Sequence, residues 1–241
     1  MVRRFGLHQQ CSLPRVSIRN IHRRETRRVM EQLNHIISTI ALSMGLAWAS
    51  GINLYAAILV LGLLGATGHM VLPPDLQILA HPMVLAAAGF MYLVEFVTDK
   101  IPGVDTGWDA LHTFIRIPAG AVLAAGAVGK VDPVAALVAA LVGGFLAAGT
   151  HVTKAGTRVL INTSPEPISN WIASVLEDVT VIFGMWAALY HPWLFLVLLI
   201  AFILLLIWIL PKIWRGVKKV FGMISSFISG RKADAPADQG Q

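Results

Sequence analysis

Long apolar stretches, separated by short polar segments, run through most of the chain. Six of them are expected to cross a membrane as helices: residues 36–70, 82–98, 118–129, 133–150, 168–190 and 192–210. About 20 apolar residues are needed to span the hydrocarbon core of a bilayer, and most of these stretches are close to that length. The pattern predicts an all-α, polytopic membrane helix bundle of about six spans, with polar hairpin segments between them.

Two of the stretches do not fit one straight spanning helix. Residues 36–70 contain no Lys, Arg, Asp or Glu and are too long for one span but too short for two spans and a loop. A break is predicted between Ala49 and Asn53, because Ser-Gly weakens a helix. Residues 118–129 would be only about 18 Å long as a helix. This helix must therefore extend into the preceding segment or be buried in protein.

The fourth stretch, residues 133–150, has small residues at four-residue spacing. Small side chains allow neighbouring helices in a membrane to approach closely. A tightly packed neighbour is expected on this face, from the same chain or from a second copy in a homo-oligomer. The two rows are Ala136, Ala140, Gly144 and Ala148, and Ala135, Ala139, Gly143 and Ala147.

The composition also indicates a membrane protein. Hydrophobic residues make up 56% of the chain and charged residues only 13%, whereas soluble domains carry roughly 25% charged residues. An ordinary water-soluble enzyme is therefore excluded. The single cysteine, Cys11, excludes a disulfide framework and a cysteine-based metal site, and no cofactor is expected.

Positive charge is concentrated at the two ends of the chain. Residues 1–30 carry eight Arg and one Glu, whereas residues 211–241 carry six Lys or Arg and two Asp. Basic segments beside apolar spans are typical of contact with anionic lipid rather than with nucleic acid. Six spans would put 18 of the 19 Lys and Arg residues on one side. The positive-inside rule makes that side cytoplasmic, so the expected location is the inner (plasma) membrane with both termini in the cytoplasm.

Three regions are predicted along the chain. Residues 1–29 lack the apolar segment of a secretory signal and are expected not to pack, either as an organellar transit peptide or as an over-long start before Met30. Residues 30–210 form the transmembrane domain. Residues 211–241 are expected to begin with a basic amphipathic helix on the membrane surface and to end in a disordered tail. The apolar positions of that helix are Trp214, Val217, Phe221 and Ile224.

Charged and polar side chains in the spans and hairpins are the candidates for function, because a charge at membrane depth costs at least about 2.5 kcal/mol. Helical spacing places several of them on common faces. Glu177 and Asp178 are adjacent and point about 100° apart, so they are expected to face different partners. The candidate substrate- or ion-binding residues are Glu95, Asp99, Asp105, Asp109, His112, Arg116, His151, Lys154, Arg158, Glu177 and Asp178.

Two interpretations of these charges stay open. In the structural one, the acidic residues of the second span pair with Lys154 or Arg158, Asp109 pairs with Arg116, and the ion pairs hold the bundle in register. In the functional one, the charges line a water-filled vestibule for an ion or an anionic solute. Between the two basic ends, ten acidic residues face five basic ones. Pairing alone cannot neutralise this excess, which favours the functional interpretation.

An enzyme is the weaker alternative. Asp105 and Asp109 have a D-x-x-x-D spacing that would suit a magnesium-bound diphosphate of a lipid, but no second acidic cluster of the needed form accompanies it. The histidines show no H-E-x-x-H or similar metal-ligand spacing. No catalytic residue and no metal site are predicted.

Two adjacent segments carry a specific resemblance to a known family. Residues 95–105 read Glu-Phe-Val-Thr-Asp-Lys-Ile-Pro-Gly-Val-Asp, and residues 108–118 read Trp-Asp-Ala-Leu-His-Thr-Phe-Ile-Arg-Ile-Pro. Together with residues 154–158, 162–167 and 177–178, they resemble a bacterial membrane family catalogued as domain of unknown function 4126. The resemblance covers about residues 36–190. It implies a multi-span membrane protein of bacterial origin and brings no assigned activity.

The sequence thus favours a small transporter or channel-like protein with a charged vestibule on the cytoplasmic side. In this hypothesis Glu95, Asp99, Glu177 and Asp178 form a cation or proton site, while basic residues of the fourth helix meet an anionic group. The alternative is a non-transporting membrane scaffold or assembly factor. A membrane enzyme acting on a lipid phosphate ranks third.

Overall fold

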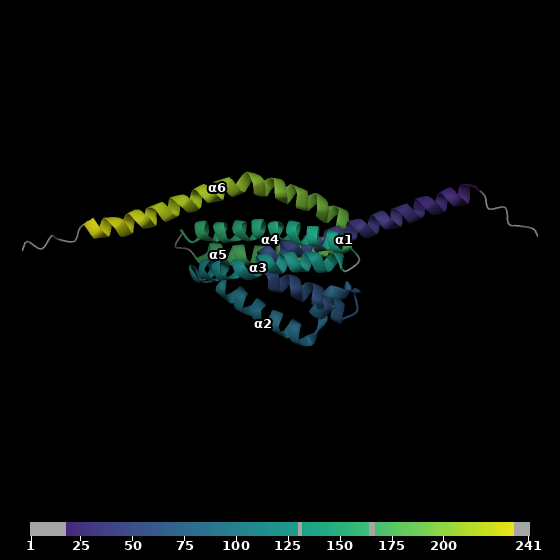
Figure 1. Ribbon diagram of the computed structural model, residues 1–241. Helices are drawn as coiled ribbons and strands as arrows, with labels where there is room; N and C mark the ends of the chain where they lie inside the picture. Colours follow the sequence, from purple (N-terminus) through teal and green to yellow (C-terminus); the bar gives the residue numbers. More distant parts are fainter. Residues whose placement is uncertain (1–17, 130–131, 164–166, 234–241) are drawn as a thin grey trace, which may run out of the picture. The chain divides into compact units, whose positions relative to one another are not determined.

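The computed structural model describes residues 18–129, 132–163 and 167–233, and these form six α-helices and one 3₁₀ helix without strands. The all-α prediction is confirmed. Residues 1–17 of the predicted N-terminal extension, Lys130, residues 164–166 and the predicted disordered tail from residue 234 lie outside the described residues. The elements are α1 (Ile18–Ala66), η1 (Pro74–Ala80), α2 (Pro82–Thr98), α3 (Val104–Val128), α4 (Pro133–Ile161), α5 (Pro167–Tyr190) and α6 (Pro192–Ala233) (Figure 1).

The chain separates into two units, residues 1–36 and residues 37–241. The described part of the first unit is the start of α1, and its side chains from His22 to Ile36 are exposed. The second unit contains the rest of α1 and all other elements. Its core is built mainly from Leu and Ala of α1, together with residues from η1, α3, α4, α5 and α6.

Helix α1 is broken at the predicted place. Asn53 has non-helical backbone angles (φ −145°, ψ 95°), and its side-chain Oδ1 accepts a hydrogen bond from the backbone N–H of Ala56 at 2.9 Å. A side chain that accepts this bond serves as the N-cap of the following helix. Asn53 therefore ends one half of α1 and begins the other, in the middle of an apolar segment.

Helices α3 and α4 pack against each other along their lengths (Figure 1). A Cβ added at Gly120 would collide with Ala147 Cβ, 2.5 Å away, and one added at Gly143 would collide with Ala124 Cβ. The second predicted row of small residues therefore faces a neighbour within the same chain, since Ala139, Gly143 and Ala147 are all buried. Close backbone approach fixes α4 against α3, and Gly51 of α1 makes a similarly close approach to Thr150.

The polar segments beside the spans are largely helical, and residues 118–129 extend into the preceding segment, as their short length predicted. Residues 104–117 continue into the short apolar stretch as one helix, α3, with Pro118 inside it. Residues 151–161 likewise continue α4. The charged candidates Asp109, Arg116 and Lys154 thus lie within helices and are buried. The helices continue through them because the charges find partners on other helices, as described below.

Five helices of the described residues are long and apolar enough to cross a membrane, and a sixth span results if η1 and α2, which are bent by 66°, count as one. The multi-span prediction is confirmed at five to six spans. Large apolar side chains are exposed along the outside, among them Phe145 (80%) and Leu204 (63%). In a soluble protein such surfaces would be unstable, but in a bilayer they face lipid.

The last helix differs from the prediction in its extent. Residues 192–210 and the basic amphipathic segment after them form one helix, α6, with Pro211 inside it. Buried Ile213 is directed at Gly156 of α4, which leaves no room for a Cβ there. The start of the basic segment therefore packs on the bundle. That the remainder lies along the membrane surface stays a prediction.

Candidate functional site

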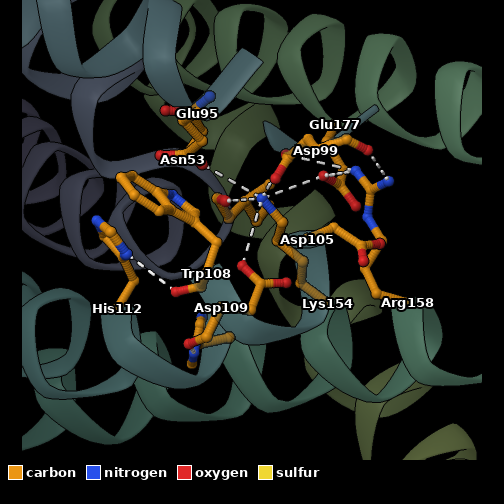
Figure 2. Close-up of polar contacts among 12 residues, drawn as sticks. Asn53, Glu95, Asp99, Asp105, Trp108, Asp109, His112, Lys154, Arg158 and Glu177 are labelled. Atoms are coloured by element: carbon orange, nitrogen blue, oxygen red, sulfur yellow. Dashed lines mark hydrogen bonds and ion pairs between the residues drawn. The ribbon is translucent and has the colours of Figure 1, made fainter. Parts of the chain in front are cut away.

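Lys154 of α4 is surrounded by four carboxylates, which come from the end of α2, from α3 and from α5. Its ammonium donates to Glu95 Oε1 at 3.2 Å and to Asp99 Oδ2 at 3.0 Å, which lie at the end of α2. It also lies 3.3 Å from Glu177 Oε2 of α5 and 3.9 Å from Asp109 Oδ1 of α3. Figure 2 shows the ammonium between these groups. The Lys154 side chain is only 3% exposed. Its ammonium is therefore surrounded by protein groups rather than by water.

Two buried guanidinium groups flank Lys154. Arg116 forms ion pairs with Glu95 and with Asp109, the latter at 3.2 Å. Arg158 pairs with Glu177 at 2.7 Å and with Asp99 at 3.4 Å. The pairs expected in the structural interpretation of the sequence are thus present, and they belong to one connected network. We call these seven residues the charge network: Glu95, Asp99, Asp109, Arg116, Lys154, Arg158 and Glu177.

The break in α1 is joined to the charge network. The Lys154 ammonium donates to the backbone carbonyl of Ile52 at 3.1 Å, immediately before the break. The side-chain amide of Asn53 donates to Asp178 Oδ1 at 2.9 Å, and the Tyr92 hydroxyl donates to Asp178 Oδ2 at 3.1 Å. Irregular backbone at membrane depth is tolerated where protein groups satisfy it. Glu177 and Asp178 face different partners, in agreement with their predicted divergence.

The charge network has more negative than positive groups. Four carboxylates face three cations. Moreover, Glu95 Oε2, Asp99 Oδ1 and Asp109 Oδ2 are buried and have no hydrogen-bond partner among the described residues. Ionised carboxylate oxygens are acceptors with several lone pairs, so these atoms are suited to receive a proton or a small cation.

Access to the charge network is uneven. The side chains of Glu95, Asp109 and Arg116 are 0% exposed, whereas that of Glu177 is 20% exposed. Asp178, next to it on α5, is half-buried. The network is therefore fully buried at its α3 end and least buried beside α5, where Glu177 lies.

The remaining candidates lie around the charge network. His151 is buried, with its Nδ1 3.4 Å from Arg116 Nη1 and its Nε2 2.9 Å from Thr113 Oγ1. His112 Nε2 lies 3.1 Å from the Tyr55 hydroxyl. Asp105 is separate from the three cations, and its Oδ1 accepts hydrogen bonds from its own turn and from Asn162 Nδ2 at 2.8 Å. The eleven predicted residues are thus neighbours, but Asp105, His112 and Asp178 have partners of their own.

The comparison with protein families now identifies the chain. Residues 40–212 match the model of the family described as domain of unknown function (DUF4126). The chain belongs to this family. The matched range contains the whole charge network and the α1 break. No curated protein and no solved structure matches the chain.

Several polar residues of this DUF4126 domain were not predicted as site residues. Asn53 was expected only as part of a helix break, and Tyr92 and Asn162 were not assigned to the site at all. A polar side chain within an apolar span is the signal that could have identified Asn53. Tyr92 gives no such signal, because tyrosine is common in spans and only the fold brings its hydroxyl to Asp178.

Lys100 lies in the turn that follows α2, beside α5 of the DUF4126 site. Its ammonium donates to the Phe96 carbonyl at 2.8 Å and lies 3.4 Å from Ser174 Oγ of α5. Burial lowers the pKa of Lys100, while the nearby charge of Asp178 acts to raise it. Lys100 thus places a positive charge near Asp178 and makes no ion pair with the four carboxylates of the charge network.

The described residues of this DUF4126 protein contain no cluster of His, Cys, Asp or Glu arranged to hold a metal ion. Asp105 and Asp109, the pair considered for a magnesium-bound diphosphate, also have different interaction partners. Asp109 pairs with Arg116, whereas Asp105 is hydrogen-bonded at the start of α3. The two carboxylates therefore have different partners: Asp109 belongs to the charge network and Asp105 does not.

Proposed function

We propose that this DUF4126 protein is a small transporter or channel-like protein that moves a proton or a small cation. The observation that carries the proposal is the buried excess of carboxylates around Lys154, beside a broken helix. Broken helices with charged residues at their breaks are typical of binding sites in transporters. The proposed location is the bacterial inner membrane with both termini in the cytoplasm.

The charge balance supports a cation rather than an anion. Lys154 and Arg158, which the sequence suggested for an anionic group, already contact carboxylates at 2.7 to 3.4 Å. One further positive charge would neutralise the network, because four carboxylates face three cations. An uncompensated charge in a low-dielectric interior is costly, and binding one proton or cation removes that cost. We therefore propose that the network alternates between a loaded and an empty state.

Glu177 is the proposed entrance. It contacts both Lys154 and Arg158 and is the most exposed carboxylate of the network. A proton or cation arriving at Glu177 would weaken these two ion pairs and free the cations to strengthen their contacts with Asp99 and Glu95. This exchange of partners is the proposed step by which charge passes from Glu177 to the buried end.

Flux measurements in liposomes test the proposal. The full chain is reconstituted, a potassium gradient with valinomycin sets the membrane potential, and internal pH or sodium is followed with a dye. Wild-type protein is expected to give faster proton or sodium uptake than empty liposomes. Glu177→Gln is expected to lose most of this uptake at unchanged membrane abundance. Glu31→Gln, at an exposed position outside the network, is the matched control.

The scaffold alternative gives a different outcome in the same experiment. If liposomes that contain the wild-type protein are no more permeable to protons or sodium than empty liposomes, the proposal that the protein transports these ions is wrong. A folded Glu177→Gln variant with full flux would show that Glu177 is not the entrance. Loss of folded protein in that variant would instead support a purely structural network, since removal of one partner from a buried ion pair is destabilising.

A further inference from the structure

A groove lined mainly by apolar residues runs between α3, α4 and the second half of α6. One part has a volume of about 520 Å³, and its walls include Val152, Val159, Ile213 and Val217. A second part of about 500 Å³ continues from it, because both parts share Thr106 and Val159. Both parts of the groove are lined on one side by the segment of α6 that follows Pro211.

The groove lies where the charge of the chain changes. The first half of α6 has only apolar residues from Phe195 to Ile207, whereas Lys212, Arg215, Lys218 and Lys219 follow Pro211. No Asp or Glu occurs between residues 192 and 233. The Lys218 ammonium lies 5.4 Å from the ring of Trp214, and Trp214 lines the groove. A positively charged side chain therefore lies at the edge of the apolar groove.

We infer that this groove binds an anionic phospholipid of the surrounding bilayer. Its apolar walls suit one acyl chain, and Lys218 suits the phosphate, with Arg215 and Lys219 adding to the local positive potential. Clusters of Lys and Arg next to a spanning helix attract anionic lipid headgroups, and the groove adds an acyl-chain site to that attraction. A zwitterionic lipid would gain the acyl-chain contacts but not the net charge attraction.

The inner wall of the groove connects it to the charge network. His151 and Thr113 line the groove, and their side chains contact each other at 2.9 Å. His151 also lies beside Arg116 of the network. Only the His151 side chain would therefore separate the bound lipid from Arg116 of the charge network. The inference does not depend on the proposed transport function, because it rests on the groove and on the charge of α6.

Native mass spectrometry of the full chain in mild detergent tests the inference. Phosphatidylglycerol and phosphatidylcholine with identical acyl chains are added in separate titrations. Wild-type protein is expected to retain one phosphatidylglycerol in preference to phosphatidylcholine. Lys218→Gln is expected to reduce this preference roughly fivefold without weakening phosphatidylcholine retention. Arg28→Gln, which removes an exposed Arg from the start of α1, is the charge-matched control and should keep the preference.

A second variant tests the acyl-chain part. Ala110 is exposed and lines the groove, so Ala110→Trp should fill the groove without disturbing the core and should weaken retention of both lipids. Ala87→Trp, at an exposed position of α2, should retain both. Equal retention of the two lipids by wild-type protein would overturn the inference. So would an equal loss of preference in Arg28→Gln and Lys218→Gln, or unchanged lipid retention in Ala110→Trp.

Discussion

Lys154 is the residue with the most partners in the charge network. It touches carboxylates from α2, α3 and α5 as well as the carbonyl that precedes the α1 break. No other residue of the network contacts all of these elements. Burial of so many charges is stable only while they stay paired, because a buried charge that loses its partner keeps its full desolvation cost. Removing Lys154 should therefore affect stability more than removing any surface lysine.

Lys154→Met is expected to destabilise the protein by about 3–5 kcal/mol, measured as the shift of the unfolding midpoint in detergent. The double variant Lys154→Met, Asp99→Asn should recover part of this loss, because it removes a positive and a negative partner together. A coupling energy of about 0.5–3 kcal/mol is expected for residues in contact. Exposed Lys212 is the control, and Lys212→Met should leave the midpoint nearly unchanged. Equal effects at the two lysines would contradict a paired network.

At the scale of single elements, the sequence predicted faces better than it predicted lengths. The spacing of Asp109 and Arg116 correctly placed them on one helical face, and the break near Asn53 was also predicted. The extension of the short stretch 118–129 into the preceding segment was one of two predicted options, but the start of α3 at Val104 was not predicted. A polar segment becomes a buried helix only when another element supplies opposite charges, and single-sequence periodicity does not show which elements meet. The same limit explains why the partners Tyr92 and Asn162 escaped prediction.

The α1 break gives a prediction of its own. Asn53→Ala removes both the cap on Ala56 and the hydrogen bond to Asp178. Loss of an N-cap alone costs about 0.5–2 kcal/mol, and Asp178 also loses a donor. The unfolding midpoint should fall accordingly, whereas Asn34→Ala at an exposed position should not lower it. If both variants unfold like wild type, Asn53 does not stabilise the broken helix.

The close packing of α3 on α4 is tested by two neighbouring glycines. Gly143→Ala would press a methyl group into Ala124, whereas a methyl group at Gly144 meets its nearest neighbour, Ala121 Cβ, at 3.4 Å. Overpacking of this kind costs about 1–3 kcal/mol, while alanine in place of an accommodated helical glycine adds up to about 1 kcal/mol. Thermal unfolding should therefore separate the two variants, with Gly143→Ala lower and Gly144→Ala equal to or above wild type. The opposite order would contradict the packing.

At the scale of the whole molecule, the number of spans decides the orientation. Five helices qualify on their own, and six spans require η1 and α2 to cross together. Composition predicted the multi-span character, because apolar stretches dominate the chain. It could not predict the 66° bend between η1 and α2, which depends on how both pack on the bundle. The charge distribution favours six, since an odd number would place one basic end outside.

Labelling of the two ends tests this topology. Single cysteines at Glu31 and Lys219, in a background with Cys11 replaced by Ser, are treated with a membrane-impermeant maleimide. Six spans predict that both positions react only when the cytoplasmic side is accessible. Reaction from opposite sides would establish an odd number of spans and would place one basic segment outside the cytoplasm.

The central claim is that water reaches the charge network beside Glu177, and three neighbouring cysteines test it. In the isolated chain Leu176 and Val179 are more exposed, at 58% and 56%, than the Glu177 side chain at 20%. In a bilayer they should face lipid, where a thiol does not ionise and an impermeant maleimide does not arrive. We predict that Glu177→Cys is labelled in intact membranes while Leu176→Cys and Val179→Cys are not. Protection of Glu177→Cys together with its neighbours would contradict the account.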